Sequence, residues 1–117
     1  PPTPASIIPR LLILLGHNPT DVEFADICGR TDVYALAILY DVNFSSRRAT
    51  CVAAAIVAVV LEDREGFDRA EVIRAIVRAF DDPGGIGEEG IAACARMVDD
   101  FRAALSSSSA GDAIVED

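Results

Sequence analysis

The chain has 117 residues, of which 51% are hydrophobic and 25% charged, and its 19 acidic and 10 basic side chains leave a formal charge of −9. This composition is that of a globular protein, and the length suits one folded domain. The negative charge would repel a nucleic-acid backbone, and the longest uncharged apolar run, residues 50–61, is shorter than the roughly 20 residues that a bilayer span needs. We therefore expect no nucleic-acid partner and no membrane span.

Residue types that carry chemistry are sparse and scattered. Cys28, Cys51 and Cys94 lie far apart in apolar surroundings, without the CxxC spacing of a zinc site, and His17 is the only histidine. His17 falls at the expected end of a helix, where its ring can interact with the last carbonyl groups. These residues are too few and too scattered to form a metal site. Because no nucleophile lies beside a base in the expected structure, we also expect no cofactor and no enzymatic activity.

The N-terminal part of the chain is expected to form three helices, each of which begins at a capping residue or ends at a glycine. Strand signals are nearly absent, since alternation of apolar and polar residues never persists. A Ser, Thr or Asp before an apolar stretch starts a helix, and a glycine after it stops one. The expected helices are 6–15 ended by Gly16, a short one from the Thr20 cap to Gly29, and 32–40 capped by Thr31.

The fourth expected helix is almost wholly apolar. It follows a Ser45 or Ser46 cap, runs through Arg47 and Arg48, and continues without a polar face to residue 61. A helix that is apolar all round must be covered on every side, so we expect it to be the central rod of the domain. Two cations at the positive end of a helix oppose its dipole and therefore suggest a functional role.

Two further helices complete the expected fold. The segments 68–80 and 88–105 show apolar residues at three- and four-residue spacing, which is typical of amphipathic helices. Residues 106–117 are polar and lack a core pattern, so we expect a flexible tail. The predicted fold class is all-α, with five to seven short helices around a buried apolar helix in one domain spanning residues 1–105.

Residues 39–49 read Leu-Tyr-Asp-Val-Asn-Phe-Ser-Ser-Arg-Arg-Ala and lead directly into the apolar helix. This segment resembles the first homology motif of the Bcl-2 family of apoptosis regulators, where Asp-Gly-Val-Asn-Trp-Gly-Arg precedes a buried central helix. Residues 82–86 are similar to the second homology motif, which ends in Gly-Gly-Trp. Residues 12–17 are similar to the family's Leu-x-x-x-Gly-Asp helix. Phe44 and Ile86 replace the two tryptophans, and the short chain looks most like viral members.

The resemblance implies a Bcl-2-like bundle that promotes survival by binding amphipathic death-motif helices of pro-apoptotic Bcl-2 proteins in a hydrophobic groove. It implies a place of action in the host-cell cytoplasm, in association with mitochondria. Arg47 or Arg48 would bind the partner's aspartate, and Asn43 would add a hydrogen bond. The residues expected to receive the partner's apolar side chains are Phe24, Val33, Ala37 and Ile38.

Other interpretations of the same residues stay open. Ordinary core packing accounts equally well for the four apolar groove residues. The chain could instead be a structural helical module that forms a homodimer through exposed apolar surface. A third alternative is a phosphate-handling enzyme using the glycine-rich segment 84–87, although Glu88 and Glu89 would repel an anion there.

Overall fold

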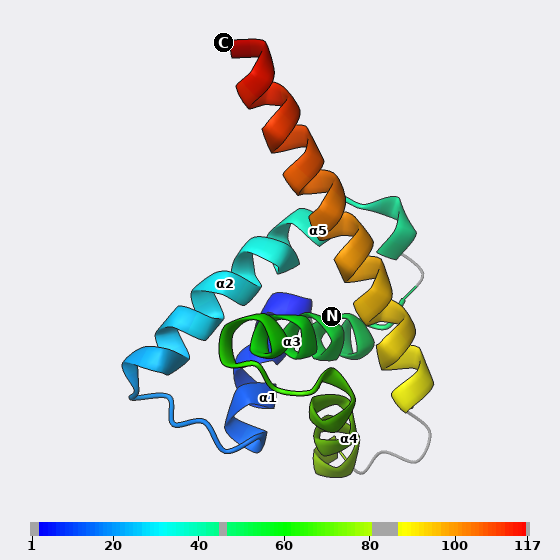
Figure 1. Ribbon diagram of the computed structural model, residues 1–117. Helices are drawn as coiled ribbons and strands as arrows, with labels where there is room; N and C mark the ends of the chain where they lie inside the picture. Colours follow the sequence, from blue (N-terminus) through cyan, green and yellow to red (C-terminus); the bar gives the residue numbers. More distant parts are fainter. Residues whose placement is uncertain (1–2, 45–46, 81–86, 117) are drawn as a thin grey trace.

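All regular structure in the described part of the chain is helical. The computed structural model describes residues 3–44, 47–80 and 87–116, with side chains as far as residue 106. These ranges contain no strand, which confirms the all-helical prediction. The Ser45 or Ser46 cap and the 82–86 motif lie outside them. The elements are α1 (Pro4–Leu14), α2 (Val22–Ile38), the 3₁₀ turn η1 (Val42–Phe44), α3 (Ala49–Glu65), α4 (Arg69–Phe80) and α5 (Glu88–Glu116) (Figure 1).

α3 lies at the centre of the bundle, as its sequence predicts. Every residue from Val52 to Leu61 is buried, with no more than 4% of its surface exposed. α1, α2, α4 and α5 all pack against this helix, and Figure 1 shows them around it. Burial of each valine, leucine or isoleucine contributes about 1.5–3 kcal/mol, and the alanines between them let neighbouring helices approach closely. The burial of α3 therefore organises the whole fold.

α1 begins and ends at local sequence signals. The Thr3 hydroxyl accepts a hydrogen bond from the Ser6 amide while the Ser6 hydroxyl accepts one from the Thr3 amide, so the two residues form a capping box. The helix therefore starts earlier than the expected residue 6. At its other end, the Gly16 and His17 amides donate to the carbonyls of Ile13 and Leu12. Gly16 has φ 97°, a left-handed conformation that favours glycine, and the predicted stop is confirmed.

α2 is one continuous helix, so the predicted break at Gly29 and the predicted cap at Thr31 are wrong. Thr31 is fully buried, and its hydroxyl donates to the Cys28 carbonyl instead of capping a new helix. A glycine inside a helix costs only about 1 kcal/mol, which burial of Ile27 and Ile38 on the two halves outweighs. Thr20 does not cap the helix either, because its amide and hydroxyl both donate to the Asn18 side chain.

Residues 41–44 form a tight turn between α2 and α3. The Asp41 side chain accepts a hydrogen bond from the Asn43 backbone amide at 2.9 Å. The Asp41 carbonyl accepts one from the Phe44 backbone amide at 3.1 Å. α3 itself begins at Ala49, with Arg48 as its N-cap residue and no side-chain capping bond. Arg47 and Arg48 therefore precede the helix, and the prediction that they lie inside its first turn is wrong.

α5 continues to Glu116, well beyond the expected end near residue 105. No proline interrupts residues 106–116, so the backbone can keep its helical hydrogen bonds past the end of the buried stripe. Figure 1 shows this last part of α5 extending away from the bundle. Among the helices that the structure describes, none combines the length and apolar character needed to cross a bilayer.

Candidate functional site

The turn η1 packs against α5 through an aromatic pair. Phe44, which stands where the Bcl-2 motif has tryptophan, is only 6% exposed. Its ring lies edge-on to that of Phe101, with 6.5 Å between centroids and 90° between planes. Such edge-to-face pairs contribute about 0.5–1.5 kcal/mol beyond their buried area. Phe44 thus fixes the turn that carries Asn43 to the side of α5.

A cavity of about 520 Å³ lies between this turn and α5, and we refer to it as the η1–α5 cavity. Two of the residues predicted to bind a partner helix, Asn43 and Arg47, both line it. The apolar part of the lining comes from Phe44 and from α5. The lining residues are Asp41, Asn43, Phe44, Arg47, Met97, Asp100, Phe101 and Ala104. The cavity therefore combines an apolar surface with a guanidinium, a side-chain amide and two carboxylates.

The charged side chains of this cavity are not paired with one another. Among the described residues, no ion pair involves Arg47, Asp41 or Asp100. Arg47 and Asn43 are exposed. The guanidinium of Arg47 is therefore available to an incoming carboxylate, with five N–H donors in a planar arrangement.

A smaller cavity of about 180 Å³ adjoins the first, since Asp41, Phe44 and Arg47 line both. Its wall includes Ile38, one of the predicted apolar contacts, which is 3% exposed and belongs mainly to the core. The structure therefore brings Ile38 to the same region as Arg47.

The remaining predicted residues lie elsewhere. Val33 is 63% exposed and lines a separate cavity of about 200 Å³ with Tyr34, Val60 and Arg102 of α5. Phe24 is half-buried and packs against the core, and Ala37 is also half-buried. Arg48 is exposed but lines neither of the two cavities beside Arg47. The structure therefore does not bring the whole predicted set together at one cavity.

The α5 wall of the site could not be predicted from the sequence. Met97 and Phe101 belong to the apolar stripe of the expected helix 88–105, which predicts that they are buried, whereas both are half-buried and line the η1–α5 cavity. The fully buried residues of α5 are Ile91, Cys94, Ala95 and Val98. The apolar stripe of 88–105 is wider than core packing alone requires, and this width is the signal that could have indicated a second role.

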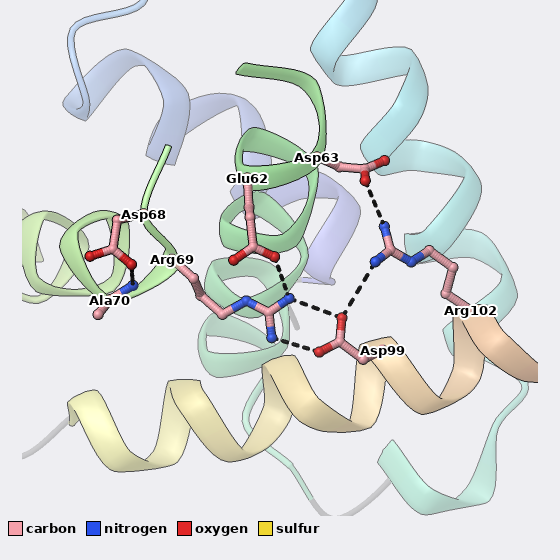
Figure 2. Close-up of polar contacts among 7 residues, drawn as sticks. All are labelled: Glu62, Asp63, Asp68, Arg69, Ala70, Asp99 and Arg102. Atoms are coloured by element: carbon pink, nitrogen blue, oxygen red, sulfur yellow. Dashed lines mark hydrogen bonds and ion pairs between the residues drawn. The ribbon is translucent and has the colours of Figure 1, made fainter. Parts of the chain in front are cut away.

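A network of ion pairs holds α5 in place on its other flank (Figure 2). Arg69 donates to both oxygens of Asp99, at 2.6 and 3.0 Å, and to Glu62 at 2.7 Å. Arg102 lies 3.6 Å from Asp99 and 3.4 Å from Asp63. The network joins the end of α3 and the start of α4 to α5. It therefore helps to set the position of the helix that forms one wall of the cavity.

The charge of Arg47 also affects the pKa values of two cysteine thiols, Cys51 and Cys94. Burial raises the pKa of the Cys51 thiol, and the charges of Arg48 and Arg47 oppose that rise. Burial and the nearby Cys51 raise the pKa of Cys94, which Arg47 again opposes. Both cysteines are free, and a raised pKa keeps a thiol neutral. Nowhere in the described ranges do three or more histidine, cysteine or carboxylate side chains gather as metal ligands would.

No protein-family model, curated protein sequence or solved structure matches this chain.

Proposed function

We propose that this protein is a pro-survival apoptosis regulator of the Bcl-2 type, similar to viral members, which sequesters amphipathic death-motif helices of pro-apoptotic proteins. The motif-like segment 39–49 and the buried apolar helix that follows it both support this proposal. A Bcl-2-like bundle is the finer fold that we propose for the helices described above. The proposed place of action is the host-cell cytoplasm, in association with mitochondria.

One observation carries the proposal. Arg47 and Asn43, the two polar residues that the motif predicts, line a single cavity together with the apolar side chains Phe44, Met97 and Phe101. A cation that is unpaired among the described residues, placed beside an apolar wall, suits a helix that presents one carboxylate among hydrophobic side chains.

The proposed binding mode follows from the chemistry of these groups. The partner's aspartate would accept two parallel hydrogen bonds from the Arg47 guanidinium, which are roughly twice as strong as neutral ones. The Asn43 amide would hydrogen-bond to the polar edge of the same helix. The partner's apolar side chains would lie against Phe101 and Met97, where burial supplies most of the affinity.

The test is titration of the purified protein with labelled death-motif peptides, followed by fluorescence anisotropy. Micromolar or tighter binding is expected, with at least about tenfold weakening in Arg47→Ala, since truncation of a charge-paired residue typically costs over 1 kcal/mol. Arg48→Ala is expected to have the smaller effect, because Arg48 does not line the cavity. Arg78→Ala, an exposed arginine on α4, is the matched control.

Two results would count against the proposal. One is a lack of binding at micromolar peptide concentration. The other is binding that Arg47→Ala leaves unchanged. Expression of the wild-type chain and of Arg47→Ala in cells given a death stimulus would then test the pro-survival effect, with the variant expected to protect less.

A self-associating helical module is the second candidate, and an exposed apolar stripe favours it. Val22, Val33 and Leu36 share one face of α2, and Tyr40 follows just beyond its end. Their exposed fractions are 86%, 63%, 58% and 90%, respectively. Exposed apolar patches often mark interfaces, so this stripe would form the contact in a homodimer. Sedimentation of the wild type and of a Val33→Asp variant separates the candidates, because a dimer built on this face would dissociate in the variant.

A further inference from the structure

The η1–α5 cavity contains three charged side chains that have no ion-pair partner in the described part of the chain. Among the described lining residues, Arg47 is the single cation, and Asp41 and Asp100 are the two anions. None of the three forms an ion pair with another described residue. By contrast, Arg64, Arg69 and Arg102 all have carboxylate partners. A ligand with complementary charges can therefore pair with all three without breaking an ion pair among the described residues.

The two carboxylates come from different walls. Asp41 belongs to the turn before η1, and Asp100 belongs to α5 on the other side of the cavity. A helix lying across the opening of this cavity with its apolar stripe against Phe101 would direct one polar flank toward each wall. Each flank would then meet a carboxylate, and the carboxylate of the helix would meet Arg47.

We propose that the η1–α5 cavity selects amphipathic helices that carry a basic side chain on each flank of the carboxylate that meets Arg47, so that charge pattern decides which partners bind. This inference rests on the function proposed above and adds the chemical class of the preferred partner. A partner helix with an uncharged or acidic flank would place a side chain without positive charge opposite Asp41 or Asp100.

The charge of the whole chain acts in the same direction. With a formal charge of −9, the protein attracts cationic ligands at long range and repels anionic ones. Complementary charges at the rim of an interface chiefly raise the association rate and the discrimination between partners, and salt weakens both effects. The charge preference is therefore expected to be strongest at low ionic strength.

The probes are three synthetic amphipathic helical peptides with the same leucine stripe and the same single aspartate. They differ only at two flanking positions, which are both lysine, both glutamine or both glutamate. Binding to the full chain is measured by fluorescence anisotropy at low and at physiological salt. Lysine peptide is expected to bind best and glutamate peptide worst, with about two- to five-fold change in affinity per charge at low salt. The differences in affinity among the three peptides should decrease as salt is added.

Two variants assign the preference to the named carboxylates. Asp100→Asn removes one charge, and Asp41→Asn removes the other while keeping the side-chain oxygen that accepts the Asn43 amide. Each is expected to reduce the advantage of the lysine peptide over the glutamine peptide by about two- to five-fold. Glu71→Gln, an exposed site on α4 outside the cavity, makes the same change in net charge and should leave the ranking intact.

The outcomes separate the two proposals. If all three peptides bind equally and Arg47→Gln weakens them all, the groove stands and the charge selection is overturned. If Glu71→Gln reduces the preference as much as Asp100→Asn does, the preference comes from net charge and the inference is also overturned. If no peptide binds, or Arg47→Gln has no effect, the proposed function itself fails.

Discussion

Arg69 and Asp99 form a two-point ion pair that joins α4 to α5. The guanidinium nitrogens Nη1 and Nη2 lie 2.6 and 3.0 Å from the two carboxylate oxygens, and Nη2 also reaches Glu62 of α3 at 2.7 Å (Figure 2). Three helices thus meet at one side chain. Hydrogen bonding to Asp99 raises the pKa of Arg69 above its ordinary value, burial opposes this rise, and bonding to Glu62 adds to it.

Replacing Arg69 with alanine is expected to destabilise the fold. The change removes three charge-assisted hydrogen bonds and leaves Glu62 and Asp99 without their shared cation. We expect a loss of about 1–2 kcal/mol in the free energy of unfolding, at the lower end for charged hydrogen bonds because both carboxylates are about a third exposed or more. Urea unfolding followed by circular dichroism measures it. Arg74→Ala on the same helix, exposed and without an ion pair in the described ranges, should change stability by less than about 0.5 kcal/mol.

The continuity of α2 predicts that Gly29→Ala stabilises the protein. Gly29 lies within the helix, and an added Cβ would have no atom within 4 Å. Alanine is favoured over glycine in a helix interior by about 0.5–1 kcal/mol. Thermal and urea unfolding should therefore both shift upward. Gly16→Ala is the opposite control, since its φ of 97° makes alanine unfavourable by about 1–2 kcal/mol. Destabilisation by Gly29→Ala would instead support the helix break expected from the sequence.

The ring contact between Phe44 and Phe101 predicts energetic coupling between the two positions. In a double-mutant cycle with Phe44→Leu and Phe101→Leu, the two destabilisations should be non-additive by about 0.5–1.5 kcal/mol, because either change alone already removes the contact. Urea unfolding of the four proteins gives the coupling. A parallel cycle that pairs Phe44→Leu with Phe67→Leu, a half-exposed ring outside this contact, should be additive. Additivity in the first cycle would contradict the packing of η1 on α5.

Asp26 predicts a specific acid response. Its carboxylate accepts Nε–H bonds from Arg64 at 2.7 Å and from Arg30 at 3.2 Å, and these bonds lower the pKa of Asp26 from its ordinary 3.8. A carboxylate with a depressed pKa in the folded state stabilises the fold above its unfolded pKa. That contribution disappears as the pH falls through the folded pKa. Asp26→Asn should therefore lower the urea midpoint at neutral pH, and its difference from wild type should begin to shrink near pH 4 and continue to shrink as the pH falls through the lowered folded pKa.

The control for this experiment is Asp32→Asn on the same helix, where the exposed carboxylate makes no ion pair with a described residue. Its difference from wild type is expected to stay small at every pH. A pH-independent difference for Asp26→Asn would show that the loss comes from something other than the ionised carboxylate.

Much of the fold could be predicted from the sequence because its signals are local. The run from Val52 to Leu61 has no polar side for water to contact, so only a central position satisfies it. Gly16 ends α1 through a backbone conformation that favours glycine. Asn43 and Arg47 lie four residues apart around one turn, and their shared cavity follows from that proximity.

The predictions that differ from the structure depended on competing energies. Gly29 is a legitimate stop signal by itself, but its cost of about 1 kcal/mol is smaller than the gain from burying Ile27 and Ile38 along one continuous helix. The end of α5 near residue 105 was inferred from the loss of an apolar stripe. Helical hydrogen bonds do not require that stripe, so the helix can continue beyond it.

The sequence by itself determined a helical protein built around one buried apolar helix, since composition and local punctuation specify these, whereas the structure placed the arginines before that helix and not in its first turn. Only the tertiary structure decided which surfaces meet. It brought Met97 and Phe101 of α5 to the side of Arg47 and placed Val33 at a different cavity. Such contacts join residues far apart in the chain, and they depend on how whole helices pack rather than on any local pattern.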